Sequence, residues 1–235
     1  MKTKSKYALK IMKWEKKQNR ASMSEMLKNE IRALSAASHP NILKLHDYSI
    51  REVALFDDLS SIDVSFLALE YASNHDLSSY VYHCGRFPEQ VARFYFTQLV
   101  DAIGHLFSKA YSHRDVKLEN CLLDADFNLK LADFGLSTKV KTCYKCVGTY
   151  EYMAPEVLKQ ADYNTVPVDI FAVGVVLFYM TTGLMPFSRA SKADAYYNKV
   201  IEGDWETLWA MYYSDDPSIS DLSNDLKDLL EQMMS

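Results

Sequence analysis

The sequence predicts an α+β fold with two segregated lobes. Up to about residue 72 the pattern is mostly strands around one helix, whereas the remainder consists of helices with two short strands between them. The 235 residues contain no internal repeat, and 49% of them are hydrophobic, so the chain can bury a substantial core. We therefore predict a small β-rich lobe over residues 1–72 and a larger helical lobe over residues 73–235, with a hinge at 70–74.

The small lobe is predicted to contain three strands and one helix. Tyr7–Met12 alternates as a strand does, and a helix capped by Ser22 or Ser24 runs to about residue 37, where His39-Pro40 ends it. Its apolar face should comprise Met23, Met26, Leu27, Ile31 and Leu34. Strands are expected over residues 42–48 and 64–70, separated by a polar insertion at 51–63 to which we assign no chemistry.

The large lobe is predicted to begin with a long helix from Phe87-Pro88-Glu89 to about residue 110, with Pro88 in its first turn. The side chains expected to face inward are Val91, Phe94, Leu99, Ile103 and Leu106. Short strands follow near residues 121–123 and 129–132, and helices near 156–159, 168–182, 190–200 and 222–234.

Bulk properties narrow the class of protein. A formal net charge of −5 argues against a nucleic-acid partner. Four scattered cysteines do not form a disulfide scaffold, and no apolar stretch follows the basic amino terminus as in a secretory signal. The longest apolar run, Ile170–Met180, is shorter than the roughly 20 residues of a membrane span. We expect a soluble protein without a membrane span, located in the cytoplasm, with the nucleus as an alternative.

Three motifs occur in a fixed order. His113-Arg114-Asp115-Val116-Lys117-Leu118-Glu119-Asn120 comes first, Asp133-Phe134-Gly135 follows, and Ala154-Pro155-Glu156 comes last; Ala8-Leu9-Lys10 lies far upstream. In this order the set resembles the signature of eukaryotic protein kinases over almost the whole chain. The resemblance implies the two-lobed protein kinase fold, with ATP and Mg²⁺ as cofactors.

Phosphoryl transfer requires metal ions, positive charge on the phosphates and a carboxylate beside the incoming hydroxyl. Asp115 is the candidate for that carboxylate, and Lys117 is the candidate cation for the transferring phosphate. Asn120 and Asp133 offer the oxygen ligands that Mg²⁺ prefers, and Gly135 is expected to permit the backbone turn that directs Asp133 inward. The predicted catalytic residues are therefore Asp115, Lys117 and Asn120, and the metal ligands are Asn120 and Asp133.

The resemblance also implies a nucleotide site. Lys10 corresponds to the strand lysine that holds the α- and β-phosphates, and its partner should be a glutamate of the next helix. Helical register favours Glu30 over Glu25.

The stretch Leu69–Ala72 matches the adenine-binding hinge of this family. The backbone groups of Glu70 and Ala72 would bond the adenine edge, and Leu69 would lie behind it. Ala8 and Leu122 would cover the two faces of the base.

Substrate class follows from the same comparison. Lys117 and residues 148–156 resemble serine/threonine kinases, nearest to the calcium/calmodulin-dependent and AMP-activated relatives. The expected partners are protein substrates with Ser or Thr acceptors. Glu119 and Asp76 match positions that bind arginine in basophilic relatives, which predicts a preference for basic peptides. The alternative is that both are solvated surface charges.

The sequence departs from the family at both ends. A glycine-rich loop should lie about twenty residues before Lys10, yet only nine residues precede it, and the chain stops before the end of the expected domain. The small lobe is therefore expected to be incomplete and the large lobe truncated. One explanation is a fragment of an active kinase; the other is a catalytically impaired pseudokinase acting as an interaction scaffold. The intact Lys10, Glu30, Asp115, Asn120 and Asp133 favour the first.

The segment between the second and third motifs is also unusual. Arg114 before Asp115 implies control by a loop phosphate and an upstream activating kinase, but the usual phosphothreonine position holds Lys145. Thr142 is the preferred substitute, ahead of Tyr144 and Thr138. Cys143 and Cys146 form a Cys-x-x-Cys pair; zinc would require two further ligands, so coincidence is favoured over a metal or redox role.

Overall fold

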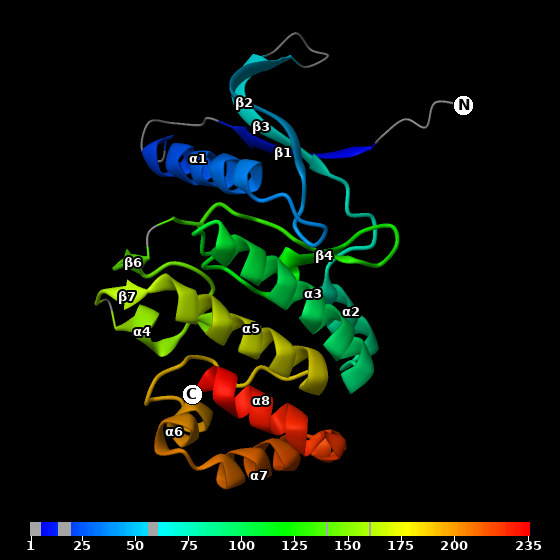
Figure 1. Ribbon diagram of the computed structural model, residues 1–235, viewed down its shortest axis with the longest axis vertical. Coiled ribbons are helices and arrows are strands. Elements are labelled where there is room, and N and C mark those ends of the chain that lie inside the picture. Colours follow the sequence, from blue (N-terminus) through cyan, green and yellow to red (C-terminus); the bar gives the residue numbers. More distant parts are fainter. Residues whose placement is uncertain (1–5, 14–19, 56–60, 140, 160) are drawn as a thin grey trace.

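The computed structural model describes residues 6–13, 20–55, 61–139, 141–159 and 161–235. A β-rich small lobe lies at one end of a larger helical lobe, which confirms the predicted two-lobed α+β class (Figure 1). The small lobe comprises β1 (Tyr7–Lys13), α1 (Arg20–Ala36), β2 (Leu45–Leu55) and β3 (Ser61–Glu70). Its three strands form an antiparallel sheet in the order β1-β3-β2.

The alternation of β1 positions Lys10. Ala8, Lys10 and Met12 are half-buried on one face of the strand, while Tyr7, Leu9 and Ile11 are exposed on the other. In the pairing with β3, Ala8 lies opposite Leu69 and Lys10 opposite Leu67. A strand with period two therefore directs the lysine to the same face as Ala8.

The structure differs from three expectations for the small lobe. Helix α1 begins at Arg20, so neither Ser22 nor Ser24 caps it; Arg20 and Ala21 are good helix formers and extend it past both serines. Met26 is exposed rather than part of the buried face, and the side chain of Met23 lies outside the described residues. In the polar stretch 51–63, residues 51–55 belong to β2 and residues 61–63 belong to β3, while residues 56–60 lie outside the described residues.

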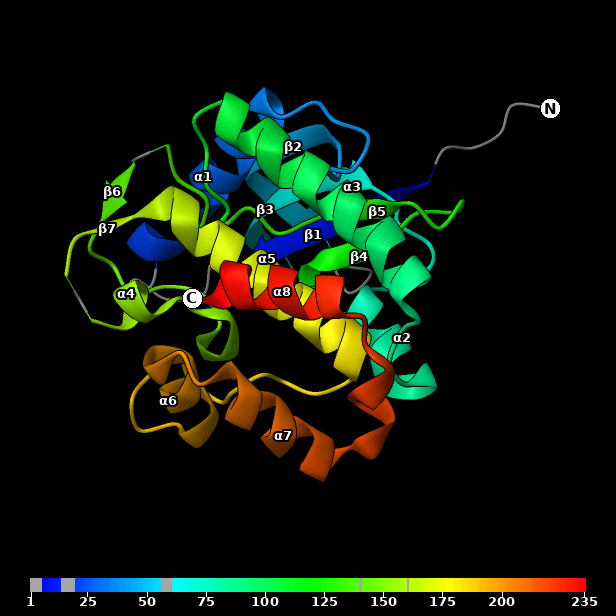
Figure 2. The ribbon, with the colours of Figure 1, turned by 60° about the horizontal axis from the view of Figure 1, so that its bottom comes forward.

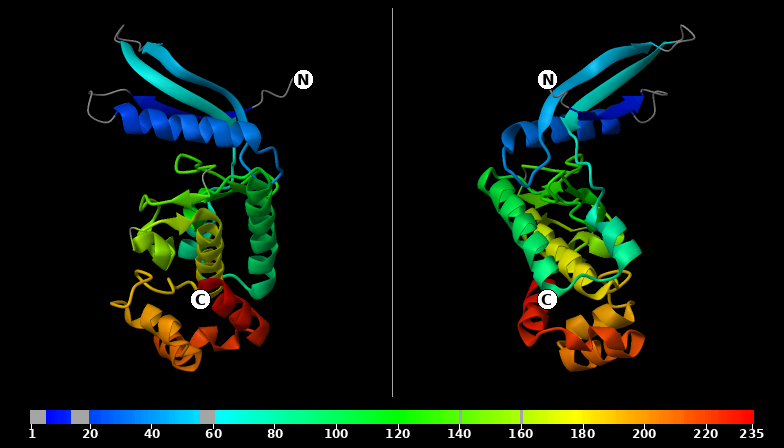
Figure 3. Two further views of the ribbon diagram at one scale, coloured as in Figure 1. Left: turned by 60° about the vertical axis from the view of Figure 1, so that its left-hand side comes forward. Right: turned by 90° about the vertical axis from the view of Figure 1, so that its right-hand side faces the viewer.

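The large lobe consists mainly of helices. They are α2 (Leu77–Cys84), α3 (Glu89–Ser108), α4 (Pro155–Leu158), α5 (Thr165–Thr182), α6 (Ala195–Glu202), α7 (Trp205–Asp215) and α8 (Asn224–Met234). The short strands are β4 (Cys121–Leu123), β5 (Leu129–Leu131), β6 (Thr142–Cys143) and β7 (Tyr163–Asn164). Helices α2 and α7 were not predicted. Figure 2 shows α8 lying across α5, and the views in Figure 3 show the small lobe above the ends of α3 and α5.

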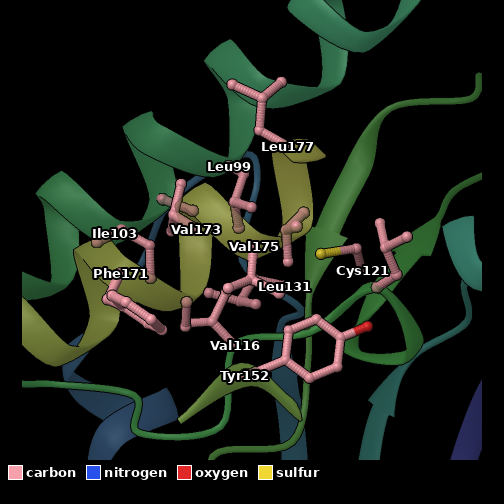
Figure 4. Close-up of a cluster of buried hydrophobic side chains, with 14 of the residues drawn as sticks. Leu99, Ile103, Val116, Cys121, Leu131, Tyr152, Phe171, Val173, Val175 and Leu177 are labelled. Carbon is pink, nitrogen blue, oxygen red and sulfur yellow. The ribbon is translucent and has the colours of Figure 1, made fainter. Parts of the chain in front are cut away.

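Helix α5 is the centre of the large lobe. It is long and apolar enough to cross a membrane by length and composition, but 78% of it is buried inside this protein, as in a core helix. A methyl group added at Gly174 would lie 2.9 Å from Cβ of Met233, so α5 and α8 pack in direct contact. Figure 4 shows Val116 and Tyr152, which flank the site described below, within the same buried cluster as Phe171.

Helix α3 has a different inner face from the predicted one. Phe94 is 51% exposed and Val91 is also exposed, whereas Ala92 and Tyr95 are buried. Pro88 is the N-cap rather than a first-turn residue. The expected Leu99, Ile103 and Leu106 are buried, so the error is confined to the amino-terminal turns, where apolar residues occur on both sides of the helix.

Candidate active site

Lys10 joins the two lobes. Its Nζ lies 2.9 Å from both carboxylate oxygens of Glu30 and 2.9 Å from Oδ1 of Asp133. Burial opposes the charge of Lys10, but the two carboxylates outweigh it and hold the pKa of Lys10 above its ordinary value. Burial raises the pKa of Glu30, whereas for Asp133 the contacts with Lys10 outweigh burial and lower the pKa. The structure therefore pairs Lys10 with the glutamate that helical register favoured.

Asp133 takes its orientation from its own backbone. Its φ is +61°, in the left-handed region that aspartate tolerates better than most residues. The expectation that Gly135 supplies this turn is wrong, since Gly135 does not have a positive φ. The intervening Phe134 is fully buried and meets the ring of His113 edge-on, with centroids 4.8 Å apart. This packing ties residues 133–135 to the first motif.

Asp169, near the start of α5, supports the backbone of the loop that carries Asp115. Its carboxylate accepts hydrogen bonds of 2.7 Å from the backbone N–H groups of His113 and Arg114. Complete burial raises the pKa of Asp169 to about 7, and the hydrogen bonds from these two N–H groups only partly offset that effect. Arg114 has a φ of +67°, so the backbone immediately before Asp115 is held in an unfavourable conformation.

Neighbouring side chains hold the carboxylate of Asp115 in place. The hydroxyl of Thr149 donates to Oδ1 of Asp115 at 2.8 Å, and Nζ of Lys117 lies 3.3 Å from Oδ2. Lys117 also donates to the hydroxyl of Thr149 at 2.8 Å, which closes a triangle of three side chains. Sequence reasoning missed the role of Thr149, although the Gly148-Thr149 pair was visible as part of the serine/threonine pattern.

Asn120 is buried beside Asp115. Its Nδ2 donates to the backbone carbonyl of Asp115 at 2.8 Å, so the amide nitrogen of Asn120 faces the loop. The amide oxygen of Asn120 and the half-exposed carboxylate of Asp133 are oxygen donors that fit a Mg²⁺ ion completed by water and phosphate. Among the described residues, no three His, Cys, Asp or Glu side chains are grouped to hold a metal.

The predicted hinge follows β3. Leu69 is buried, and Ala8, Ala72 and Leu122 are half-buried against the main core. The carboxylate of Glu70 lies 2.8 Å from Nζ of Lys130 in the large lobe. The side chain of Glu70 is therefore used between the lobes, which is compatible with a nucleotide role for its backbone alone.

The two acidic residues expected to bind substrate arginine differ in their surroundings. Both oxygens of Asp76 accept hydrogen bonds from Ser79, through its backbone N–H at 2.8 Å and its hydroxyl at 2.9 Å, so Asp76 is the N-cap of α2. Glu119 is exposed, and its carboxylate accepts a hydrogen bond from the hydroxyl of Tyr152 at 3.4 Å. Asp76 is therefore already used as a helix cap, whereas Glu119 has the freer carboxylate for a guanidinium.

Comparison with known proteins agrees with this geometry. The family model described as "Protein kinase domain" matches residues 1–235. The chain belongs to the protein kinase family. Its kinase relatives include "CBL-interacting serine/threonine-protein kinase 26" of Arabidopsis thaliana, 35% identical over 204 residues. "CBL-interacting serine/threonine-protein kinase 24" of the same plant is 37% identical over 178 residues. "CBL-interacting protein kinase 31" of Oryza sativa subsp. japonica is 35% identical over 204 residues.

These kinases are longer than the chain. The matches cover 84%, 74% and 84% of the chain but only 44%, 38% and 43% of the respective relatives. The chain therefore spans less than half the length of the curated kinases that it matches. The names of the relatives agree with the serine/threonine type inferred from Lys117 and residues 148–156.

Proposed function

We propose that this chain transfers the γ-phosphoryl group of ATP to a serine or threonine hydroxyl of protein substrates. The observation that carries the proposal is the triangle of Asp115, Lys117 and Thr149 beside the Lys10–Glu30–Asp133 cluster. A carboxylate held in a fixed rotamer can orient an incoming hydroxyl and accept its proton. A neighbouring lysine supplies positive charge where the phosphoryl group is in transit.

The remaining residues act on the nucleotide. Lys10, held by Glu30, supplies positive charge for the α- and β-phosphates, and Asn120 and Asp133 would hold Mg²⁺. When bound, Mg²⁺ neutralises the negative charge of the phosphates. The backbone of the hinge at Glu70 and Ala72 would bond the adenine edge, and Leu69, Ala8 and Leu122 would enclose it.

The pseudokinase alternative has no observation in its favour. A scaffold does not need Lys10 paired with Glu30, nor Asp115 held by Thr149, because both arrangements serve the chemistry of transfer. We therefore propose an active serine/threonine kinase.

The test is phosphorylation of a serine or threonine peptide in Mg²⁺ and ATP by the wild-type chain and by Asp115→Asn. We expect kcat of the variant to fall by roughly 10²–10⁴, the range for a positioned acid–base group. Asp133→Asn should abolish metal-dependent turnover. Asp126→Asn is the matched control, since Asp126 is an exposed aspartate in the β4–β5 turn. Equal activity of wild type and Asp115→Asn would contradict the assignment, and no turnover by wild type would favour the scaffold.

A further inference from the structure

The guanidinium of Arg114 contacts the thiol of Cys143. Its Nη1 donates to Sγ of Cys143 at 3.0 Å, and its Nε donates to the carbonyl of Leu136 at 2.8 Å. The phenol of Tyr163 interacts with both Arg114 and Cys143. The thiol of Cys143 therefore accepts a hydrogen bond from the guanidinium that is expected to contact a phosphate in a kinase regulated by its loop.

Cys143 lines a cavity that is rich in cations. The cavity has a volume of about 410 Å³, and its charged lining comprises Arg32, Arg114, Lys139 and Lys145 against the single carboxylate of Glu25. Cys143 is half-buried at this cavity, so its sulfur is within reach of a small solute. Four cations facing one carboxylate favour a solute that carries negative charge.

The surroundings also favour the reactive form of the thiol. Burial raises the pKa of Cys143, but the backbone N–H of Lys145 and the charge of Arg114 outweigh burial and place it below its ordinary value. The thiolate is the nucleophilic form of cysteine. Cys121, by contrast, is fully buried, and burial raises its pKa far above the ordinary range.

We propose that Cys143 is a site of thiol–disulfide exchange with a small anionic disulfide, for which oxidised glutathione is the natural probe. The thiolate of Cys143 attacks one sulfur of the disulfide, a new S–S bond forms, the original S–S bond breaks, and one glutathione thiolate leaves. The carboxylates of the attached glutathione are then placed among Arg32, Lys139 and Lys145. The attack is assigned to Cys143 because Cys146 is not among the residues that line this cavity, and its sulfur lies 3.9 Å from Sδ of Met153 instead.

The exchange has a consequence for the kinase site. A mixed disulfide is uncharged at the Cys143 sulfur, so the contact with Arg114 is lost. The segment that carries Cys143 continues through Gly148 to Thr149, which holds Asp115. Modification should therefore displace Thr149 and lower kcat. This part rests on the proposed function, whereas the exchange itself does not.

Mass spectrometry of each cysteine after incubation with oxidised glutathione tests the site without an activity assay. Cys84, which is exposed at the end of α2, is the internal reference. We expect Cys143 to react with oxidised glutathione about tenfold faster than with neutral hydroxyethyl disulfide, the size of a moderate electrostatic steering effect, with no such preference at Cys84. An equal preference at both cysteines, or faster reaction of Cys84 with oxidised glutathione, would overturn the proposal.

Variants that remove positive charge from the cavity test whether its cations select the anionic disulfide. Lys139→Gln combined with Arg32→Gln should slow glutathione attachment at Cys143 and leave attachment of the neutral disulfide unchanged. Arg93→Gln, an exposed substitution on α3, is the matched control. If the double variant reacted more slowly with both disulfides to the same extent, the charges of Lys139 and Arg32 would not select the solute. That result would also overturn the proposal.

The regulatory part has its own readout. Glutathione-treated wild type should lose activity and regain it with dithiothreitol, whereas Cys143→Ser should show no glutathione-dependent change. Cys146→Ser should behave as wild type. If Cys143 is modified and kcat is unchanged, the site stands and its coupling to Thr149 is rejected. If neither treated nor untreated chain is active, the labelling result still decides the site.

Discussion

The hydroxyl of Thr149 donates to Oδ1 of Asp115 across 2.8 Å, and these residues are 34 positions apart in the sequence. Thr149 belongs to the segment before α4, whereas Asp115 belongs to the catalytic loop. The hydrogen bond therefore depends on the position of the segment that carries Thr149. Lys117 bonds to the same hydroxyl, so one side chain of this segment orients both groups assigned to the transfer step.

Removing that hydroxyl should weaken catalysis. Thr149→Val keeps the shape of the side chain but loses a hydrogen bond to a charged group, which is worth about 1.5–3 kcal/mol. We expect kcat to fall by about 10- to 100-fold, with little change in the KM for ATP. Thr149→Ser should restore most of the activity. Steady-state kinetics of the three proteins provides the measurement, and a valine variant with wild-type kcat would show that Asp115 needs no such support.

Gly148 should not tolerate a side chain. Its φ is +115°, and a Cβ would lie 2.7 Å from the backbone carbonyl of Arg114, which cannot move without shifting the loop. Gly148→Ala should lower the free energy of unfolding by about 1–3 kcal/mol and reduce activity. Gly104→Ala on α3, where a Cβ meets open space, should instead add about 0.5–1 kcal/mol. Urea unfolding compares them; equal effects would contradict the assigned strain.

Asp169 should give stability a measurable pH dependence. Its pKa of about 7 in the folded protein exceeds the ordinary value of 3.8, so the folded state binds this proton more tightly. The resulting stabilisation is fully present below pH 3.8 and is lost as pH rises through about 7. The free energy of unfolding should therefore fall more steeply with pH in wild type than in Asp169→Asn.

The same variant should be less stable at every pH, since an asparagine offers one acceptor oxygen to two N–H donors. The expected loss is about 1–3 kcal/mol. Chemical unfolding of both proteins at a series of pH values measures the slope and the offset. Parallel curves would mean that the carboxyl of Asp169 does not titrate in this range.

Substrate selection should depend on Glu119 and not on Asp76. Glu119→Gln should reduce the enrichment of arginine on the amino-terminal side of the acceptor in a positional-scanning peptide array. Asp76→Ala should leave that enrichment intact and lower stability by about 0.5–2 kcal/mol, as expected for a lost helix cap. An array without arginine enrichment in wild type would remove the basophilic prediction altogether.

Phosphorylation of Thr142 by an upstream kinase is expected to activate the protein. Thr142 is exposed and lines the same cavity as Arg32, Arg114 and Lys139, so a phosphate near −2 would find several cations. Thr142→Ala should block activation. Mass spectrometry of active enzyme supplies the measurement, and full activity with no phosphate anywhere between Ser137 and Thr149 would reject Thr142 together with Tyr144 and Thr138.

Part of this architecture could be predicted because local patterns determine it. The period of a helix distinguished Glu30 from Glu25, and the short catalytic motifs placed Asp115, Asn120 and Asp133 in one region. The functional roles of these residues and the cytoplasmic location stay predictions.

Contacts between distant segments could not be predicted in the same way. The use of Asp76 as a cap, the placement of Thr149 on Asp115 and the burial of Tyr95 in place of Phe94 depend on which faces meet in three dimensions. Hydrophobicity alone does not distinguish two adjacent aromatic residues at the start of a helix.

Because Asp169 is buried on α5, substitutions in the two lobes should inactivate the protein in different ways. The loop that carries Asp115 is anchored to a helix enclosed by the rest of the large lobe, whereas Lys10 reaches the site from a three-stranded sheet above it. Substitutions in the sheet should weaken nucleotide binding and leave the loop that carries Asp115 in place. Lesions around α5 should eliminate turnover and folded protein together, so inactivating variants that still accumulate in cells should map mainly to the small lobe.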